Sequence, residues 1–214
     1  DEMAAGAFQM LAAGSYDDGR TLEEVVGADL WNAFSEKMDD LGLPSAMFRT
    51  MKPWLSALSL AAFELESAGY SPSAGIDTYF ASRAKEQGKE RIALETMEFQ
   101  ISLFAGLTPD ESLSFLDYTL ADLESMIPLL DEIYSKWLVG DSEFVQTEML
   151  AQFTEFPDLY DKMLRDRNMR WIPSIEKLLA GSRDAMVVVG AMHLVGEDGL
   201  VELLRQRGYT VVQQ

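Results

Sequence analysis

The chain contains no cysteine and only one histidine among its 214 residues. The absence of thiols excludes a disulfide framework, a thiolate zinc site and a cysteine nucleophile. Cations are also scarce, because 17 lysine and arginine residues stand against 36 aspartate and glutamate residues, for a formal net charge of −19. This charge repels nucleic acid and anionic membranes, so we expect no nucleic acid partner. A cationic partner or a metal ion suits the acidity, which can equally serve solubility alone.

Several well-known motifs are absent as well. The chain has no phosphate-binding P-loop, no Gly-x-Gly-x-x-Gly, no His-Glu-x-x-His and no Gly-x-Ser-x-Gly. These absences set aside nucleotide sites, one class of zinc peptidase and the serine hydrolase elbow. No apolar run approaches the roughly 18 residues that span a bilayer, and no stretch has the pattern of a signal peptide. The first residues, Asp1-Glu2-Met3-Ala4, are not typical of a natural start, so we expect that a preceding segment has been removed.

The remaining composition, 48% hydrophobic and 25% charged residues, is typical of a globular protein with a sizeable core. Helix signals dominate: Thr21-Leu-Glu-Glu24 is a capping box, and Thr108-Pro109-Asp110-Glu111 places an N-cap, a first-turn proline and a glutamate at the start of a long helix. Pro128 should kink or break that helix. Without repeats or a low-complexity linker, we predict a single domain over residues 1–214, with a helical lobe at 109–180 inside it.

Three short segments are predicted as strands, at Arg91–Leu94, Met186–Val189 and Tyr209–Val212. The first of them follows a helix and a glycine turn, which is half of a crossover unit and implies a parallel sheet. The predicted fold class is therefore α/β, with a small, mainly parallel sheet of about three strands covered by many helices. So few strands are a thin support for this much helix, and we expect part of the sheet to lie outside the chain.

Two polar side chains follow predicted strands at the point where each strand ends. Glu95 comes directly after the first strand, and His193 follows the second one beyond Gly190. Ligands bind at the carboxyl ends of parallel strands, and a glycine there lets the backbone approach a ligand closely. A carboxylate and an imidazole can hold a metal ion or act as a general base. The alternatives are a semi-buried structural histidine and a glutamate that only caps the helix beginning near Thr96.

Arg167 is a further candidate because it lies four residues from Trp171 on an apolar helix face. A guanidinium beside a buried surface needs an anionic partner, which a carboxylate of the site or of a substrate would provide. Asp77 has a simpler alternative explanation, since it is placed where it could be a helix N-cap.

The motifs occur in this order: Lys52-Pro-Trp54, Gly75-Ile-Asp77, Leu94-Glu-Thr96, Arg167-Asn168 with Trp171, and Val189-Gly-Ala-Met-His-Leu-Val-Gly-Glu-Asp-Gly-Leu200 followed by Leu203-Leu-Arg-Gln-Arg-Gly-Tyr209. Together they resemble the TraB/GumN family (TraB/PrgY/GumN), which is related to the Tiki metalloproteases. The similarity covers nearly the whole chain with similar spacing. The last motif is specific, whereas the others are weak singly.

The resemblance implies an α/β protein in which two Gly-x-x-His motifs, a glutamate and an arginine meet in one pocket, proposed to be a metal-dependent hydrolase. Gly190-Ala-Met-His193 matches the second of these motifs, Glu95 matches the glutamate, and Arg167 matches the arginine. We therefore expect His193, Glu95 and Arg167 to be catalytic. His193 and Glu95 are also the expected ligands of a divalent metal ion, and Gly190, Asn168 and Asp77 are expected to bind the ligand.

The chain departs from the family pattern at its beginning, because the first Gly-x-x-His, which the family carries on an N-terminal strand, is absent. We expect an N-terminally truncated domain that cannot complete the site alone. One histidine and one glutamate are too few ligands for a metal ion at full occupancy.

Three functional hypotheses follow. The first is a metal-dependent, peptidase-like hydrolase acting on a peptide or small-molecule substrate, and the second is a non-catalytic protein that binds or sequesters such a ligand. The third is a homodimer formed through an exposed sheet edge. An extracytoplasmic, periplasmic location is compatible with the family resemblance.

Overall fold

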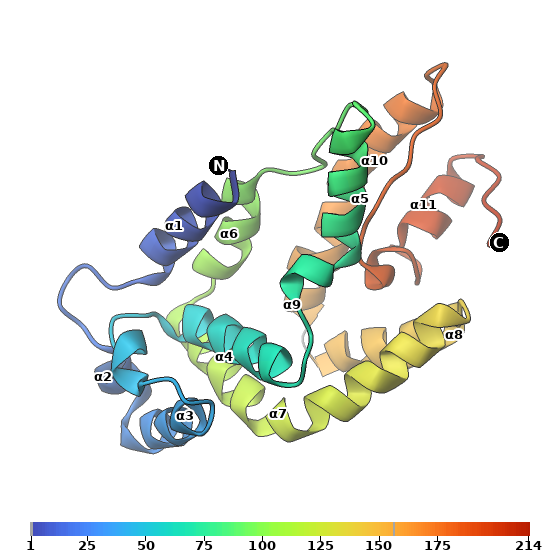
Figure 1. The fold of residues 1–214 in the computed structure, drawn as a ribbon. Helices are drawn as coiled ribbons and strands as arrows, with labels where there is room; N and C mark the ends of the chain where they lie inside the picture. The colour runs from blue at the N-terminus through green and yellow to red at the C-terminus, as the bar shows by residue number, and fades with distance from the viewer. Residues whose placement is uncertain (1, 156) are drawn as a thin grey trace. The chain divides into compact units, whose positions relative to one another are not determined.

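The structure, a computed structural model, describes residues 2–155 and 157–214, and this part of the chain is mainly helical (Figure 1). The α-helices are α1 (Glu2–Gly14), α2 (Leu22–Val26), α3 (Ala28–Asp40), α4 (Pro53–Ser67), α5 (Ile76–Glu86), α6 (Met97–Ala105), α7 (Pro109–Leu138), α8 (Ser142–Phe144), α9 (Pro157–Tyr160), α10 (Asp166–Leu179) and α11 (Leu200–Gln206). Shorter helical turns are η1 (Ser45–Phe48), η2 (Pro72–Ala74), η3 (Val145–Met149), η4 (Leu150–Glu155), η5 (Asp161–Arg165) and η6 (Ala191–His193).

The chain divides into two compact units. Unit 1 comprises the described residues up to Gly75 together with Thr96–Leu129, and unit 2 comprises Ile76–Glu95 and Leu130–Gln214. Helix α7 therefore belongs to unit 1 up to Leu129 and to unit 2 beyond it. The boundaries differ from those of the helical lobe expected at 109–180, and the single domain stays a prediction.

In unit 1, the predicted helix starts are confirmed by their hydrogen bonds. The Thr21 hydroxyl accepts from the Glu24 amide at 3.3 Å, and the Glu24 carboxylate accepts from the Thr21 amide at 2.9 Å. Thr108 and Glu111 form the same reciprocal pair at the start of α7. Each pair satisfies two amides that a helix N-terminus leaves without partners. The buried cluster beneath these helices consists of Leu22, Phe34, Met38, Phe48, Ala57, Leu60, Leu116 and Leu123.

Helix α7 is continuous through Pro128, so the predicted break does not occur. An interior proline costs a helix about 3 kcal/mol, and burial of Leu116 and Leu123 on the same helix offsets such a cost. Although α7 is long, the described helices include none with the length and apolar character needed to cross a membrane.

In unit 2, the buried cluster joins α10 to α11. Trp171, Ile172 and Ile175 of α10 pack with Leu200 and Leu203 of α11. The π-helical turn η5 immediately precedes α10. A π turn holds one more residue than an α turn and so changes which side chains share a face.

The predicted α/β fold class is wrong for the part of the chain that the structure describes, where no strand and no sheet are formed. The nearest approach to sheet pairing is an isolated bridge between Ser15 and Met51. The segments 91–94, 186–189 and 209–212 run as coil, and Figure 1 shows this for the chain between α10 and α11.

The strand prediction fails because strand propensity describes a side chain on a pleated surface and is realised only beside a neighbouring strand. Here Leu94 and Val189 pack against the cluster of α10 and α11 instead. Their neighbours Ile92 and Met186 are 56% and 67% exposed. The described residues form no sheet edge through which the expected dimer could pair. The dimer itself stays a prediction.

Candidate functional site

The predicted site residues Glu95, Arg167, Asn168 and His193 all belong to unit 2. His193 closes the short turn η6, where its side chain is buried, and its Nδ1 lies 2.7 Å from Oδ1 of Asn168 on α10. Burial and, after it, the positive charge of Arg167 lower the pKa of His193 to about 4, against an opposite effect of Glu95. His193 is therefore a neutral imidazole near pH 7.

Glu95 and Arg167 form an ion pair with both side chains largely withdrawn from solvent, at 8% and 18% exposure. Arg167 Nη2 donates to Glu95 Oε1 at 2.5 Å, and Arg167 Nε donates to Oε2 at 3.2 Å. This two-bond geometry is the one a guanidinium makes best with a carboxylate. Arg167 Nη1 also donates to the backbone oxygen of Met163 at 3.1 Å. The anionic partner predicted for Arg167 is thus Glu95.

Thr96, rather than Glu95, caps the helix that follows. The Thr96 hydroxyl accepts from the Phe99 amide at 3.2 Å at the start of α6. The carboxylate of Glu95 is directed to Arg167 instead.

Trp171 connects the ion pair to the histidine. Its Nε1 donates to Glu95 Oε2 at 3.2 Å, and its ring lies 4.5 Å from the His193 ring between centroids. The guanidinium of Arg167 lies over the same indole at 5.0 Å, a distance at which a cation is attracted by the ring face. One indole therefore contacts the imidazole, the guanidinium and the carboxylate.

Asp77 and Gly190 occupy different surroundings. Asp77 is exposed in the first turn of α5, and within residues 2–155 and 157–214 no hydrogen bond or ion pair joins it to the other predicted site residues. Gly190 lies beside the site, with φ −61 and ψ 145, and an added Cβ would lie 3.8 Å from Cδ2 of His193. Its backbone conformation is open to any residue, so the fold alone does not require glycine there.

Gly199, at the N-cap of α11, contrasts with Gly190. A Cβ on Gly199 would lie 2.7 Å from the Leu194 carbonyl oxygen and closer still to that of Val195. We expect Gly199→Ala to lower the free energy of unfolding by about 1–3 kcal/mol, because backbone atoms cannot move aside as a flexible side chain would. Gly190→Ala is the matched control and should leave stability nearly unchanged in urea denaturation. Equal losses in the two variants would contradict this account.

A model of the TraB/PrgY/gumN family matches residues 1–213. The chain belongs to this family. It is 30% identical over 184 residues to "Uncharacterized protein YbaP" of Escherichia coli (strain K12) and, to the same extent, to the protein of that name in Shigella flexneri. Each alignment covers 86% of this chain and 68% of the relative. No solved structure matches the chain. The family predicted from the motifs is thereby confirmed.

The TraB/GumN resemblance implies a metal ion, and the structure provides only part of a ligand set for it. His193 is neutral, its Nδ1 faces Asn168, and no hydrogen bond to its Nε2 occurs among the described residues, so Nε2 fits a metal ligand. Glu95 already accepts three N–H bonds from Arg167 and Trp171 and could bind a cation only beside or in place of these. Within residues 2–155 and 157–214, no three side chains of ligand type gather in one group.

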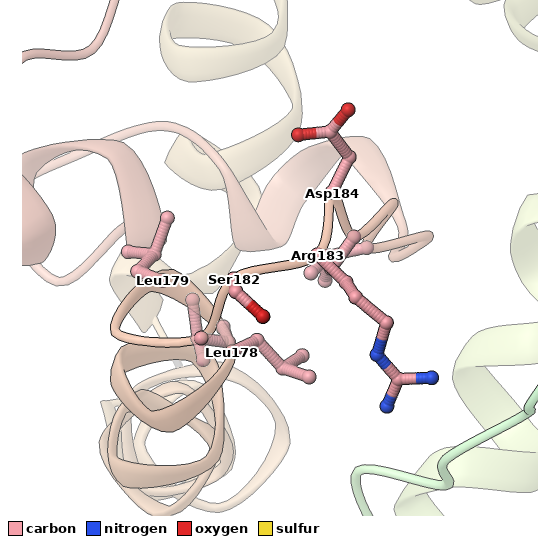
Figure 2. Close-up of a pocket in the computed structure, with 9 residues that line it drawn as sticks. Leu178, Leu179, Ser182, Arg183 and Asp184 are labelled. Carbon is pink, nitrogen blue, oxygen red and sulfur yellow. The ribbon is translucent and has the colours of Figure 1, made fainter.

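An open hollow of about 480 Å³ lies elsewhere in unit 2, at the end of α10. Figure 2 shows Leu178 and Leu179 with Ser182, Arg183 and Asp184 of the loop that follows them. Arg183 makes an exposed ion pair with Glu90 at 3.0 Å. The hollow contains none of the predicted site residues and has no comparable buried polar group, so we assign the candidate site to the residues around His193.

Sequence reasoning missed two residues that support the site. The backbone oxygen of Asp198 accepts from Asn168 at 2.7 Å, and its carboxylate accepts from the Tyr160 hydroxyl at 3.1 Å. Burial and then the charge of Asp198 raise the pKa of Tyr160 to about 12, so the phenol stays protonated as a donor. Asp198 lay within the specific motif ending at Leu200, whereas nothing in the sequence distinguished Tyr160.

Proposed function

We propose that this chain contributes His193 and Glu95 to the site of a metal-dependent hydrolase that cleaves a peptide or a similar amide. The observation that carries the proposal is a buried, neutral imidazole held in the same unit as a carboxylate–guanidinium pair. Clustered ionisable groups of this kind, with a strongly shifted pKa, are found preferentially at functional sites.

In this proposal, Nε2 of His193 binds a cation or accepts a proton from the attacking water. A divalent ion, when bound, would lower the pKa of a coordinated water and polarise the scissile carbonyl. His193 would hold it through Nε2, with Glu95 as the second candidate ligand. Asn168 holds the imidazole through Nδ1.

Arg167 would stabilise negative charge that develops on the substrate. Its guanidinium is already bonded to Glu95 and to the Met163 carbonyl. These bonds and the one from Nε use three of its five N–H groups, so a substrate oxygen would bind to the remaining Nη N–H groups, or Glu95 would have to turn away. Movement of Glu95 would alter the environment of Trp171, which donates to the same carboxylate.

The second candidate is a protein that binds and sequesters a peptide without cleaving it. The two-bond Glu95–Arg167 pair favours this second candidate, because groups that are already bonded to each other make a rigid binding surface more readily than a reactive one. The net charge of −19 suits a cationic peptide. The two candidates differ in the fate of the peptide, which one cleaves and the other leaves intact.

The test is a His193→Gln substitution in the full-length protein, with Met169→Ala on α10 as a matched control because Met169 is 46% exposed. Each protein is loaded with Zn²⁺, Mn²⁺ or Co²⁺, its metal content is measured, and a mixture of peptides is analysed by mass spectrometry after incubation. We expect His193→Gln to reduce metal content and to slow cleavage by about 10²–10⁴-fold. Unchanged metal content and cleavage in His193→Gln would refute the role of His193 in the site, and retention of intact peptides by the unmodified protein would favour sequestration.

A further inference from the structure

Asn168 is the most deeply buried polar group in contact with the candidate site, with 1% of its surface exposed. Its amide nitrogen donates to two backbone oxygens, that of Asp198 at 2.7 Å and that of His193 at 3.3 Å. These two bonds determine which end of the amide faces which partner. The reversed amide would press Oδ1 against two carbonyl oxygens, and none of the three could donate.

The orientation of the amide has a consequence for the imidazole. With Nδ2 bonded to the two carbonyls, Oδ1 faces Nδ1 of His193 at 2.7 Å. An amide oxygen can only accept, so a hydrogen bond at this distance requires the proton to be on Nδ1. We infer that Asn168 is a positioning residue that holds His193 in the Nδ1–H tautomer and leaves Nε2 with the lone pair.

This tautomer is the opposite of the one that an unconstrained neutral imidazole favours in water, which carries the proton on Nε2. The ring nitrogen that binds a metal ion or accepts a proton is set by the hydrogen bond that the other nitrogen makes. The low pKa of His193 keeps the ring neutral, so that the choice of tautomer has an effect near pH 7.

The loop that carries one of the two carbonyl acceptors is itself fixed. The side chain of Asp198 accepts from Tyr160, and the next residue, Gly199, begins α11 with no room for a Cβ. Asn168 is thus held between α10, which carries it, and a loop that is anchored at both ends. The amide cannot rotate without losing bonds on both sides.

The tautomer can be measured directly, because His193 is the only histidine in the chain. Nitrogen-15 and carbon-13 NMR of the imidazole near pH 7.5, on the metal-free protein, distinguishes the protonated from the unprotonated ring nitrogen. We expect the protonated nitrogen to be Nδ1. A ring with its proton on Nε2 would overturn the inference, and this measurement needs no variant.

One substitution then tests whether Asn168 is responsible. Asn168→Leu removes the acceptor and should shift the proton toward Nε2. Met169→Ala, on the exposed face of the same helix, is the control. A folded Asn168→Leu protein with the proton still on Nδ1 would show that another group sets the tautomer. If Asn168→Leu does not fold, the unmodified chain decides, since a neutral ring with its proton on Nε2 there contradicts the inference.

The use of Nε2 by a metal ion or substrate rests on the proposed function, but the tautomer does not. If the proton is on Nδ1 but the protein neither binds metal nor cleaves peptides, the tautomer inference holds and the proposed hydrolase function is refuted. If the protein shows metal-dependent cleavage but its metal-free form carries the proton on Nε2, the proposed function holds and the tautomer inference is refuted.

Discussion

Replacement of Glu95 by glutamine is expected to lower the free energy of unfolding by about 3 kcal/mol, the cost of leaving a buried charge without its partner. The two side chains are 8% and 18% exposed, so water can replace little of the lost interaction. Arg167 would keep its bond to the Met163 carbonyl but lose the carboxylate that accepts two of its N–H groups. Urea denaturation measures the difference.

The double variant Glu95→Gln with Arg167→Met should be less unstable than the sum of the two single variants, because each single change leaves the other charge uncompensated. Glu90→Gln is the matched control in the same unit. It breaks the Arg183–Glu90 pair, whose side chains are 82% and 59% exposed, and it should change stability little because exposed pairs contribute little. Additive losses, or an equal loss on breaking the exposed pair, would contradict the picture of a buried, coupled pair.

Acidification should destabilise the chain through His193. The pKa of His193 is lowered from 6.5 to about 4 in the folded protein, so the unfolded chain binds a proton first as the pH falls. Stability is therefore fully present above pH 6.5, is lost between pH 6.5 and about 4, and then levels off. The shift corresponds to about 3 kcal/mol, at about 1.4 kcal/mol for each pKa unit.

Carboxylates titrate at the lower end of the same pH range and also change stability there. The prediction is therefore stated as the difference in stability loss between the unmodified chain and His193→Gln. The unmodified chain should lose about 3 kcal/mol more than His193→Gln between neutral pH and about pH 4. Chemical denaturation across that range provides the measurement. Parallel curves for the two proteins would mean that His193 is not buried as a neutral ring.

Local signals in the sequence predicted the helices well and the strands badly. The reciprocal bonds of Thr21 with Glu24 and of Thr108 with Glu111 depend on residues three apart, so the pattern contains all the information that they need. The strands at 91–94 and 186–189 depend on partners far along the chain, which a local pattern does not specify. In the structure, Leu94 and Val189 pack against helices α10 and α11 instead of against other strands.

The candidate site was predicted in part, for a similar reason. Arg167 was predicted because a guanidinium on an apolar helix face needs an anionic partner. In the structure that partner is the carboxylate of Glu95. Asn168 was expected to bind a ligand, whereas its bonds run to His193 and Asp198. The π turn at Asp161–Arg165, immediately before α10, leaves no signal in side-chain periodicity.

Unit 2 is built from two separate segments of the chain, and Glu95 is the last residue of the first segment. The chain then forms Thr96–Leu129 of unit 1 before it returns to unit 2. Arg167 follows 72 residues later. At ribosomal speeds of about 5–20 residues per second, Glu95 waits roughly 4–14 s for its partner to be made. During that interval Leu94 also lacks the α10 and α11 side chains against which it packs, whereas α6, which follows, can already contact α1 and α4, so unit 2 is expected to fold only after α10 has been made.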